Sequence, residues 1–441
     1  MKDNKFKKYI CCIFTIAINL AVAVIIGMIL LCLVYMIPIS PIEKNVRQSA
    51  NVIRTEGTYP KVTEYATSQM DNFTDSIMML EAADDSDGSA MDRAMFVYRG
   101  VIDGMDRAEG LAAHFLDGSG FTRKYDYSRY WHGYLVILKP LFSLFGYTAI
   151  RIMNGIAQIF ITCLIVLLMY KKNMKKCITP YIISYLMLMP VAMARSLQFS
   201  NCFYIMSFGA LALLVLNGRQ SKIKHSDNAS MAALIFLNIG ILTAYFDLLT
   251  YPMATFGVPA VMYLFLIEGD GLINKIKKLI TKGILWCVGY GGMWVSKWAV
   301  GSLLTGTNLF DNATTVFKQR TSSTSSDGLE HFGIYASVRA NYVAFLKTPV
   351  TLLLILLFIY QVIRVLIAFK RKQVSIKEIF MRAIPFVLLA FAPMVWYVFA
   401  RNHSAIHYWF TNKACVVTAF AGLSILANPN KERTNDLDEE K

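Results

Sequence analysis

Two carboxylates, Asp71 and Asp75, are the side chains of this sequence whose type and spacing best suit general base chemistry. They belong to the segment DNFTDSIMML at residues 71–80, where apolar residues recur at the spacing of one face of a helix. One helical turn then separates the two acids, and a carboxylate within hydrogen-bond reach of a hydroxyl group can remove its proton. The alternative role is structural, because Asp71 or Thr74 could cap this helix and exposed acids are common at helix starts.

Cations beside aromatic residues are the second group with chemical potential. Arg129 and His132 lie in the segment YSRYWHGY at residues 127–134. Trp and Tyr favour the headgroup layer of a membrane, so the segment is typical of an interface belt. A cation held among them at headgroup depth is suited to bind a lipid phosphate. Lys297 lies inside an apolar run, where ionisable groups normally face a cavity or a partner, although its long side chain could instead reach the interface.

A histidine pair near the C-terminal end completes the candidates. His403 and His407 lie in the segment RNHSAIHYWF at residues 401–410 and share one face if the segment is helical. The spacing permits metal ligation, but there is no HExxH pattern and no third ligand is evident. Phosphate or acceptor binding and plain interfacial packing are the alternatives. We therefore predict no metal site and no cofactor.

The elements that must position these residues are long apolar runs. The 441-residue chain is 56% hydrophobic and 17% charged, which is too apolar for an ordinary soluble domain of this length. About 20 apolar residues cross the ~30 Å hydrocarbon core of a bilayer. The predicted fold class is an all-α integral membrane protein. Hydropathy predicts about ten transmembrane helices, at residues 9–36, 149–170, 178–194, 199–216, 231–246, 253–267, 284–304, 350–369, 384–399 and 408–426.

The basic residues indicate the orientation of these spans. The formal net charge is +15, but the basic residues gather at the ends of alternate spans and form no patch suited to nucleic acid. All five clusters fall on one side of the membrane, which the positive-inside rule assigns to the cytoplasm. They lie near residues 2–8, 171–176, 219–224, 275–282 and 370–377. We predict a multi-pass protein of the cell membrane, with both termini in the cytoplasm and no nucleic-acid partner.

This topology divides the chain into four parts. The parts are a cytoplasmic N-terminus with the first span (1–37), a large extracytoplasmic loop domain (38–130), the membrane bundle (131–427) and an acidic cytoplasmic tail (428–441). The bundle includes an interfacial or re-entrant helix near residues 135–147 and a second outer loop at residues 305–348. The polar segments at residues 81–88 and 321–328 are expected to be flexible linkers.

A first span, a large acidic outer loop and then a many-spanning bundle resemble the GT-C superfamily of membrane glycosyltransferases. The resemblance covers most of the chain as architecture, and shorter likenesses to bacterial envelope proteins with this layout lie at residues 71–80, 130–134, 244–252, 292–298 and 402–410. It implies transfer of a sugar from a polyprenyl-phosphate donor to a glycan or lipid acceptor on the outer face of the bilayer, with an aspartate of the first outer loop as base. In many members an acid follows the first span closely, whereas this sequence has Pro38, Pro41 and Glu43 there.

The resemblance gives the candidate residues their expected roles. Asp71 and Asp75 are the candidates for the base that takes the proton of the acceptor hydroxyl. Cations at headgroup depth would stabilise the charge that develops on the leaving polyprenyl phosphate. The candidates for this substrate-binding role are Arg129, His132, Lys297, His403 and His407.

Two other functions are compatible with the same sequence. A transporter or flippase for lipid-linked saccharides would place Lys297 and Asp247 in the pathway, but the sequence has no clear inverted repeat of the kind common in transporter folds. An envelope polymerase or ligase that uses lipid-linked sugars would need the same cations as a glycosyltransferase.

Overall fold

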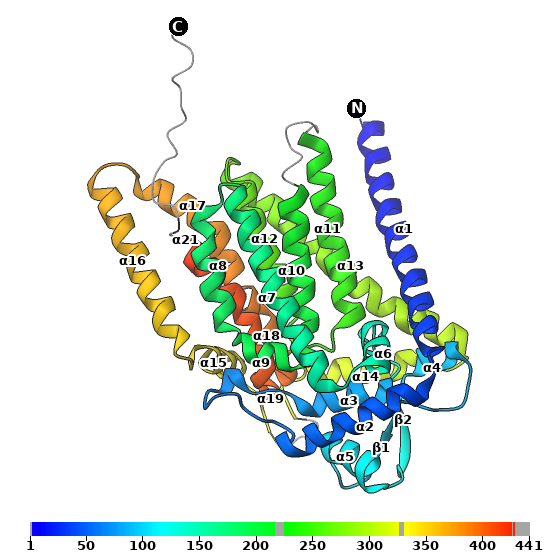
Figure 1. Cartoon of the computed structure of the whole chain (residues 1–441). Helices are drawn as coiled ribbons and strands as arrows, with labels where there is room; N and C mark the ends of the chain where they lie inside the picture. The colour runs from blue at the N-terminus through cyan, green and yellow to red at the C-terminus, as the bar shows by residue number, and fades with distance from the viewer. Residues whose placement is uncertain (1, 217–224, 326–329, 426, 428–441) are drawn as a thin grey trace.

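A computed structural model describes residues 2–216, 225–325, 330–425 and 427. The described chain is almost entirely helical, with one two-stranded antiparallel sheet. Figure 1 shows a bundle of long helices with a smaller unit packed at one end, which is formed by residues 38–130 and is called the loop unit below. Helix α1 (Lys2–Tyr35) begins at the opposite end of the bundle and ends at the loop unit.

Long apolar helices make this an all-α membrane protein. In the described part of the chain, five helical stretches are long and apolar enough to cross a membrane. They are Ile10–Tyr35 of α1, α7 (Tyr147–Lys171), α10 (Leu197–Leu216), α16 (Val350–Lys370) and the stretch Ile376–Phe399, which comprises α17 (Ile376–Ala390) and α18 (Ala392–Phe399). Except in α10, which is mostly buried, much of their surface is exposed apolar side chain, as expected for helices that face lipid.

The other predicted spans coincide with helices that are shorter, interrupted or more charged. For example, residues 178–194 are broken at Met189, which has a φ of +55° and precedes Pro190. The prediction of ten spans therefore stays a prediction. The helices concerned are α8 (Lys175–Met187), α9 (Pro190–Arg195), α11 (His225–Phe246), α12 (Met253–Leu266), α13 (Leu272–Thr305), α20 (Tyr408–Thr411), the 3-10 helix η3 (Asn412–Cys415) and α21 (Val416–Ile425).

The loop unit combines short helices with a β-hairpin. Its longest helix, α2 (Ile39–Glu56), buries Ile42, Val46 and Ile53 on one face. The strands β1 (Tyr98–Val101) and β2 (Arg123–Asp126) pair antiparallel, with Arg99 opposite Tyr125. The remaining elements are the 3-10 helix η1 (Ala66–Ser68), α3 (Asn72–Ala82), α4 (Ala90–Phe96) and α5 (Arg107–Asp117).

The helix predicted at residues 71–80 is confirmed as α3, and its N-cap is Asp71, whose side chain accepts a hydrogen bond from the Thr74 amide at 2.9 Å. The prediction of a flexible linker at residues 81–88 is wrong for its first half. Glu81 belongs to α3, and Glu81 and Asp84 are buried because α3 packs between the other helices of the loop unit and the bundle. The predicted linker at 321–328 is described only as far as residue 325, and the predicted tail at 428–441 lies outside the described residues.

Four short helices and one close helix crossing complete the described part of the bundle. The apolar stretch near residues 135–147 contains the short helix α6 (Leu135–Leu144), and its interfacial or re-entrant placement stays a prediction. The crossing of α11 and α13 depends on Gly240, where an added Cβ would lie 2.1 Å from the Trp286 carbonyl oxygen. The remaining helices are α14 (Leu309–Thr321), α15 (Ile334–Leu346) and α19 (Arg401–Ile406), which Figure 1 shows at the loop-unit end of the bundle.

Candidate functional site

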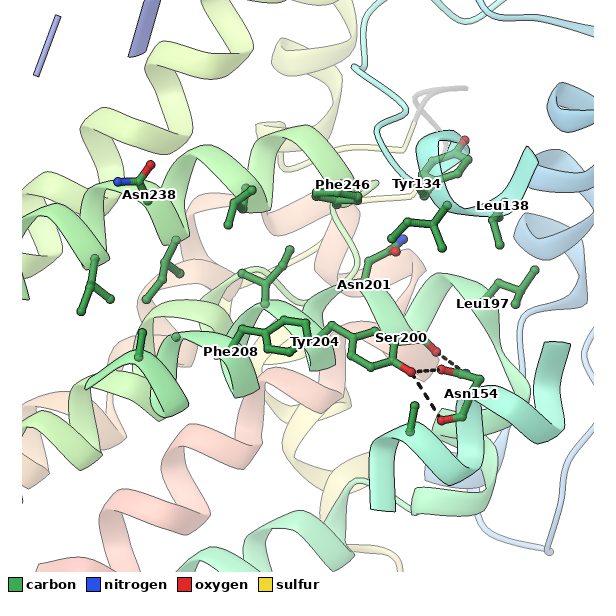
Figure 2. A pocket seen from close by; sticks show the side chains of 18 of the residues that line it. Tyr134, Leu138, Asn154, Leu197, Ser200, Asn201, Tyr204, Phe208, Asn238 and Phe246 are labelled. Atoms are coloured by element: carbon green, nitrogen blue, oxygen red, sulfur yellow. Dashed lines mark hydrogen bonds between the residues drawn. The ribbon is translucent and has the colours of Figure 1, made fainter. Parts of the chain in front are cut away.

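An elongated groove of about 860 Å³ is lined by α6, α7, α10 and α11 (Figure 2). Its walls are almost wholly apolar and include Leu138, Phe208 and Phe246. None of the described residues that line it is Asp, Glu, Lys, Arg or His. An uncharged apolar cavity of this volume suits a hydrocarbon ligand. We call it the groove below.

The groove extends along nearly all of α10. Its lining runs from Leu197 at the start of that helix to Leu216 at its end. At ~1.5 Å of rise per residue this distance is about 28 Å, close to the ~30 Å hydrocarbon thickness of a bilayer. The groove can therefore hold an extended apolar chain across most of a membrane.

A small polar group interrupts the apolar wall. The Asn154 amide donates a hydrogen bond to Ser200 Oγ at 2.7 Å, and the Tyr204 hydroxyl donates to Asn154 Oδ1 at 2.7 Å (Figure 2). The neighbouring Asn201 also lines the groove, and its buried Nδ2 has no hydrogen-bond partner among the described residues. Because an unpaired buried donor costs free energy, this amide is suited to an oxygen atom of a ligand.

Tyr134 connects the groove to the loop unit. Its side chain lines the groove, and its hydroxyl donates a hydrogen bond to Glu81, which is fully buried. His132 Nδ1 lies 2.6 Å from the same hydroxyl, and His132 Nε2 lies 2.8 Å from the Tyr127 carbonyl oxygen. The Tyr127 carbonyl only accepts, so Nε2 donates in that contact. Nδ1 also lies 3.2 Å from Glu81, and His132 therefore links Tyr127 to the Tyr134–Glu81 pair.

Backbone strain marks the same place. His132 has a φ of +56°, a left-handed conformation that is uncommon for residues other than glycine. Such conformations persist where the surrounding structure holds them, and they cluster at functional sites. Here the next amide, of Gly133, donates to the Tyr245 carbonyl oxygen at 2.8 Å, which fixes the turn against α11.

Three arginines surround Tyr127 and Tyr130, and this arginine cluster consists of Arg99, Arg129 and Arg320. The guanidinium carbons of Arg99 and Arg129 lie 4.1 and 4.3 Å from the centroid of the Tyr127 ring. Burial by itself raises the pKa of Tyr127, but Arg129, Arg99 and Arg320 together hold it below its ordinary value. The lowered pKa of Tyr127 indicates that the arginines make its surroundings strongly positive.

The cluster has more donors than acceptors. Its nearest carboxylate is Glu81, whose Oε1 lies 3.9 Å from Arg99 Nη1. The Nε atoms of Arg99, Arg129 and Arg320 are buried and have no hydrogen-bond partner in the described part of the chain. Guanidinium groups that are at least partly buried and have unpaired donors are suited to a planar or tetrahedral oxyanion such as phosphate.

The histidine pair adjoins the arginine cluster. Arg320 Nη1 donates to His407 Nε2 at 2.8 Å, so this nitrogen carries no proton. His403 Nε2 donates to the Leu249 carbonyl oxygen at 2.7 Å. Burial, followed by neighbouring charge, lowers the pKa of His403 well below its ordinary value and that of His407 to about 3. Both rings are therefore neutral, and the described residues offer no group of three metal-ligating side chains here.

Asp247 lies in the turn that meets His403. Its Oδ2 accepts a hydrogen bond from the Thr250 amide at 2.9 Å, so Asp247 caps this turn. Its Oδ1 is buried, with no hydrogen-bond partner among the residues described. Burial raises the pKa of Asp247 to about 6.

Asp75 holds the loop unit on the bundle. Its carboxylate accepts hydrogen bonds from the amides of Leu197 and Gln198 at 2.9 and 3.0 Å and from the Tyr147 hydroxyl at 2.5 Å. Amides at a helix start attract anions, so Asp75 caps α10 from a distant part of the sequence. Burial raises the pKa of Asp75, although these bonds oppose the effect. The carboxylate would have to leave these donors before it could act as a base.

A second ionic contact supports the same junction. Arg151 of α7 donates to both carboxylate oxygens of Glu56 at 2.7 and 2.9 Å. Its other terminal nitrogen donates to Asn72 Oδ1 and to the Tyr147 hydroxyl. Both bonds to Glu56 come from Nη1 alone, and the two terminal nitrogens of Arg151 together join α2, α3 and α7.

Asp71 lies nearer to the histidine pair. It is 1% exposed, and burial raises its pKa to about 7, with hydrogen bonds from Thr74 opposing this change and the charge of Asp75 adding to it. The indole of Trp409 lies beside its carboxylate and packs against the His407 ring at 5.2 Å between centroids. A carboxyl group whose pKa lies near neutrality is suited to proton transfer at physiological pH.

Lys297 lies apart from these groups. It is fully buried, and its Nζ donates to the carbonyl oxygens of Met95 and Ala94 at 2.9 and 3.3 Å. These bonds join α13 to α4, and the ammonium also lies 5.3 Å from the centroid of Trp131. The side chain is therefore held inside the protein, and none of these contacts joins it to the arginine cluster.

Of the residues predicted for the site, the structure brings Arg129, His132, His403 and His407 together around one region, with Asp71 at its border. Sequence reasoning missed Glu81, Arg99 and Arg320. One signal could have revealed Glu81, because it is the single acid directly after the apolar run Ile77–Leu80 of a buried helix. Arg99 and Arg320 come from β1 and α14, and their spacing in sequence gives no sign of convergence.

No family model matches this chain, and comparison with curated proteins and with solved structures found no similar protein.

Proposed function

We propose that the protein is a membrane glycosyltransferase that moves a sugar from a polyprenyl-phosphate donor to a glycan or lipid acceptor. The observation that carries the proposal is the connection between the groove and the arginine cluster through Tyr134 and Glu81. An uncharged groove of membrane length suits the hydrocarbon chain of the donor. Guanidinium groups that are at least partly buried suit its phosphate. A lipid-linked sugar phosphate needs these two surroundings side by side.

The proposed site lies on the outer face of the cell membrane. We infer ten spans with both termini in the cytoplasm, because the basic clusters then all lie on the cytoplasmic side. The loop unit packs at the end of the bundle opposite the start of α1, which is the outer end in this topology. The aromatic residues of the segment 127–134 then lie at the depth of the outer headgroups.

The reaction follows from this arrangement. The acceptor hydroxyl loses its proton to a carboxylate, and its oxygen attacks the anomeric carbon of the donor sugar. The bond between that carbon and the phosphate oxygen breaks, and polyprenyl phosphate leaves with the electron pair. Arg99, Arg129 and Arg320 stabilise the charge on the leaving phosphate, since preorganised donors in a water-poor site bind developing charge well.

Two carboxylates of the loop unit are candidates for the base. Glu81 lies at the groove end, and its Oε1 has no hydrogen-bond partner in the described chain. Asp71, with its pKa near 7, is the alternative beside the histidine pair. Asp75 acts as a positioning residue in either case, because it fixes α3, which carries Glu81 and is capped by Asp71, against α10.

The test is a transfer assay with the purified full chain in proteoliposomes. The donor is a synthetic polyprenyl-phosphate hexose with an isotopic label, and mass spectrometry detects the new glycosidic bond. Ala212→Trp places a large ring in the groove, whereas Val215→Trp changes an exposed residue of the same helix that does not line it. We expect Ala212→Trp to raise the KM for the donor at least about 10-fold and Val215→Trp to leave it unchanged.

Two results would overturn the proposal. One is equal activity of the two tryptophan variants. The other is movement of the labelled lipid between leaflets without formation of a glycosidic bond, which would identify a transporter for lipid-linked saccharides.

A further inference from the structure

A second, polar pocket lies within the loop unit, away from the groove. Its volume is about 310 Å³, at the lower end of the range for small-ligand sites. Residues of α2, the end of α3, α5 and the β-hairpin line it. Its polar wall includes Glu43, Asp84, His114 and Lys124, and its apolar wall includes Phe121.

Strand β1 separates this pocket from the arginine cluster. Successive residues of a strand face opposite sides. Arg99 contacts Tyr127 on one side, and Gly100 lines the pocket on the other. A Cβ at Gly100 would lie 2.3 Å from the Phe121 ring, so glycine lets this ring lie flat on the strand. The His114 ring stacks on Phe121 with centroids 3.8 Å apart.

The pocket contains polar atoms with unused hydrogen-bonding capacity. Asp84 is 5% exposed, and its Oδ1 accepts a hydrogen bond from Ser86 Oγ at 2.6 Å. Its Oδ2 is buried and has no hydrogen-bond partner among the residues that the structure covers. His114 Nδ1 donates to the Ser119 carbonyl oxygen, which leaves Nε2 as the ring nitrogen available to a ligand. The unpaired Asp84 oxygen is suited to a ligand that donates hydrogen bonds.

Charge and shape narrow the class of ligand. Lys124 lies 2.8 Å from Asp85 and 3.8 Å from Asp84, so cations already offset part of the acidic charge. A strongly charged ligand therefore gains little here, whereas hydroxyl groups can donate to Asp84 and accept from Lys124. The exposed part of the aromatic pair supplies a flat apolar surface for the carbon skeleton of such a ligand.

We propose that this pocket binds a neutral sugar unit of the acceptor glycan. The inference rests on the proposed function, and it identifies the acceptor as a carbohydrate chain. The pocket lies behind β1 as seen from the arginine cluster, so it holds a unit of the chain other than the one that reacts. Such remote contacts position the reacting end and lower the KM for the acceptor.

The test measures binding rather than transfer. Saturation-transfer NMR on the full chain in nanodiscs uses a panel of neutral disaccharides to tetrasaccharides of hexoses and N-acetylhexosamines. We expect at least one oligosaccharide to bind, and Asp84→Ala to weaken it at least about 10-fold, since hydrogen bonds to charged groups contribute roughly 1.5–3 kcal/mol. The matched control is Asp87→Ala, an exposed acid three residues further on that does not line the pocket.

Folding is checked by thermal unfolding of each variant, and Phe121→Leu gives a second route that keeps an apolar side chain but removes the ring. Absence of oligosaccharide binding, or equal binding by the Asp84 and Asp87 variants, would overturn the inference. Binding that depends on Asp84 in a protein that forms no glycosidic bond would reject the glycosyltransferase while leaving a carbohydrate site. Sugar transfer that persists without oligosaccharide binding in the pocket would reject the carbohydrate site and leave the glycosyltransferase standing.

Discussion

The hydroxyl of Tyr134 donates a hydrogen bond to Glu81, so one side chain lines the groove and also orients a buried carboxylate. The two residues are 53 positions apart in sequence and belong to the bundle and the loop unit respectively. This contact places a carboxylate at the point where a lipid chain in the groove would meet the arginine cluster.

Removal of that hydroxyl should slow the reaction. Tyr134→Phe keeps the ring in the groove wall but leaves Glu81 and His132 without their shared partner. We expect kcat for sugar transfer to fall at least about 10-fold, with a smaller change in the KM for the donor. Tyr125→Phe, in the exposed part of β2, is the control. An unchanged kcat for Tyr134→Phe would argue against a role for this contact.

The arginine cluster should bind the phosphate of the donor. Arg99→Gln removes a buried cation from the cluster and Arg129→Gln a partly buried one. We expect each to weaken binding of sugar-free polyprenyl phosphate by about 10–100-fold. Arg54→Gln is the matched change, because it removes an exposed arginine that pairs with Asp117. Calorimetric titration in nanodiscs provides the affinities, and equal affinities for all three variants would contradict the assignment.

Asp75 should matter more for stability than for chemistry. Asp75→Ala leaves the Leu197 and Gln198 amides and the Tyr147 hydroxyl without their acceptor. We expect a loss of about 3–5 kcal/mol in the free energy of unfolding, the usual cost of breaking a buried charged contact. Asp117→Ala, which breaks an exposed ion pair, should cost less than about 1 kcal/mol. Denaturant titration in detergent measures the free energy of unfolding of both variants. An equal loss in Asp75→Ala and Asp117→Ala would count against a stabilising cap of Asp75 on α10.

Asp71 should make stability depend on pH. Its carboxyl group keeps its proton up to a pH of about 7 in the folded protein, compared with 3.8 in an unperturbed chain. The folded state therefore binds more protons between these values, so a rise in pH across this window lowers the free energy of unfolding, by roughly 4 kcal/mol in total. Asp71→Asn should remove this slope. Thermal unfolding of the wild type and of Asp71→Asn from pH 4 to pH 8 measures this difference. The same dependence of stability on pH in the two proteins would refute the expectation.

The crossing of α11 and α13 should not tolerate a methyl group. A Cβ at Gly240 would lie 2.1 Å from the Trp286 carbonyl oxygen, which is backbone and cannot rotate away. We expect Gly240→Ala to lower the free energy of unfolding by about 1–3 kcal/mol, as overpacked sites do. Gly291→Ala, on α13 with open space around it, serves as the comparison and should be neutral or slightly stabilising.

Much of the architecture was predictable from hydropathy. Runs of apolar residues predict α1, α7, α10 and α16, because a membrane demands long uncharged helices. The spacing of apolar residues after Asp71 likewise predicts α3 and its cap. The prediction of a flexible linker was wrong for residues 81–84, because composition indicates only average polarity. Glu81 and Asp84 are polar, yet tertiary packing buries both and gives Glu81 a partner in Tyr134, directly before α6.

The candidate site was only partly predictable, for a physical reason. Arg129 and His132 stand in one conspicuous segment, whereas Arg99 and Arg320 come from a strand and a helix that only the folded chain brings together. Lys297 drew attention as a charge inside an apolar run, and Asp75 as one of two acids a helical turn apart. Both are held by backbone groups of distant segments. Residue type identified them as unusual, but their partners lie too far away in sequence to be inferred from spacing.

The cap that Asp75 forms on α10 also has a consequence for biogenesis. Its amide partner at Leu197 lies 122 residues further along the chain. At a synthesis rate of about 5–20 residues per second, the ribosome reaches that helix roughly 6–24 s after it makes Asp75. During this interval the carboxylate has no helix start to bind, so α3 cannot complete its docking while the insertion machinery is still handling the spans before α10. The loop unit therefore completes its folding only after α10 has been synthesised.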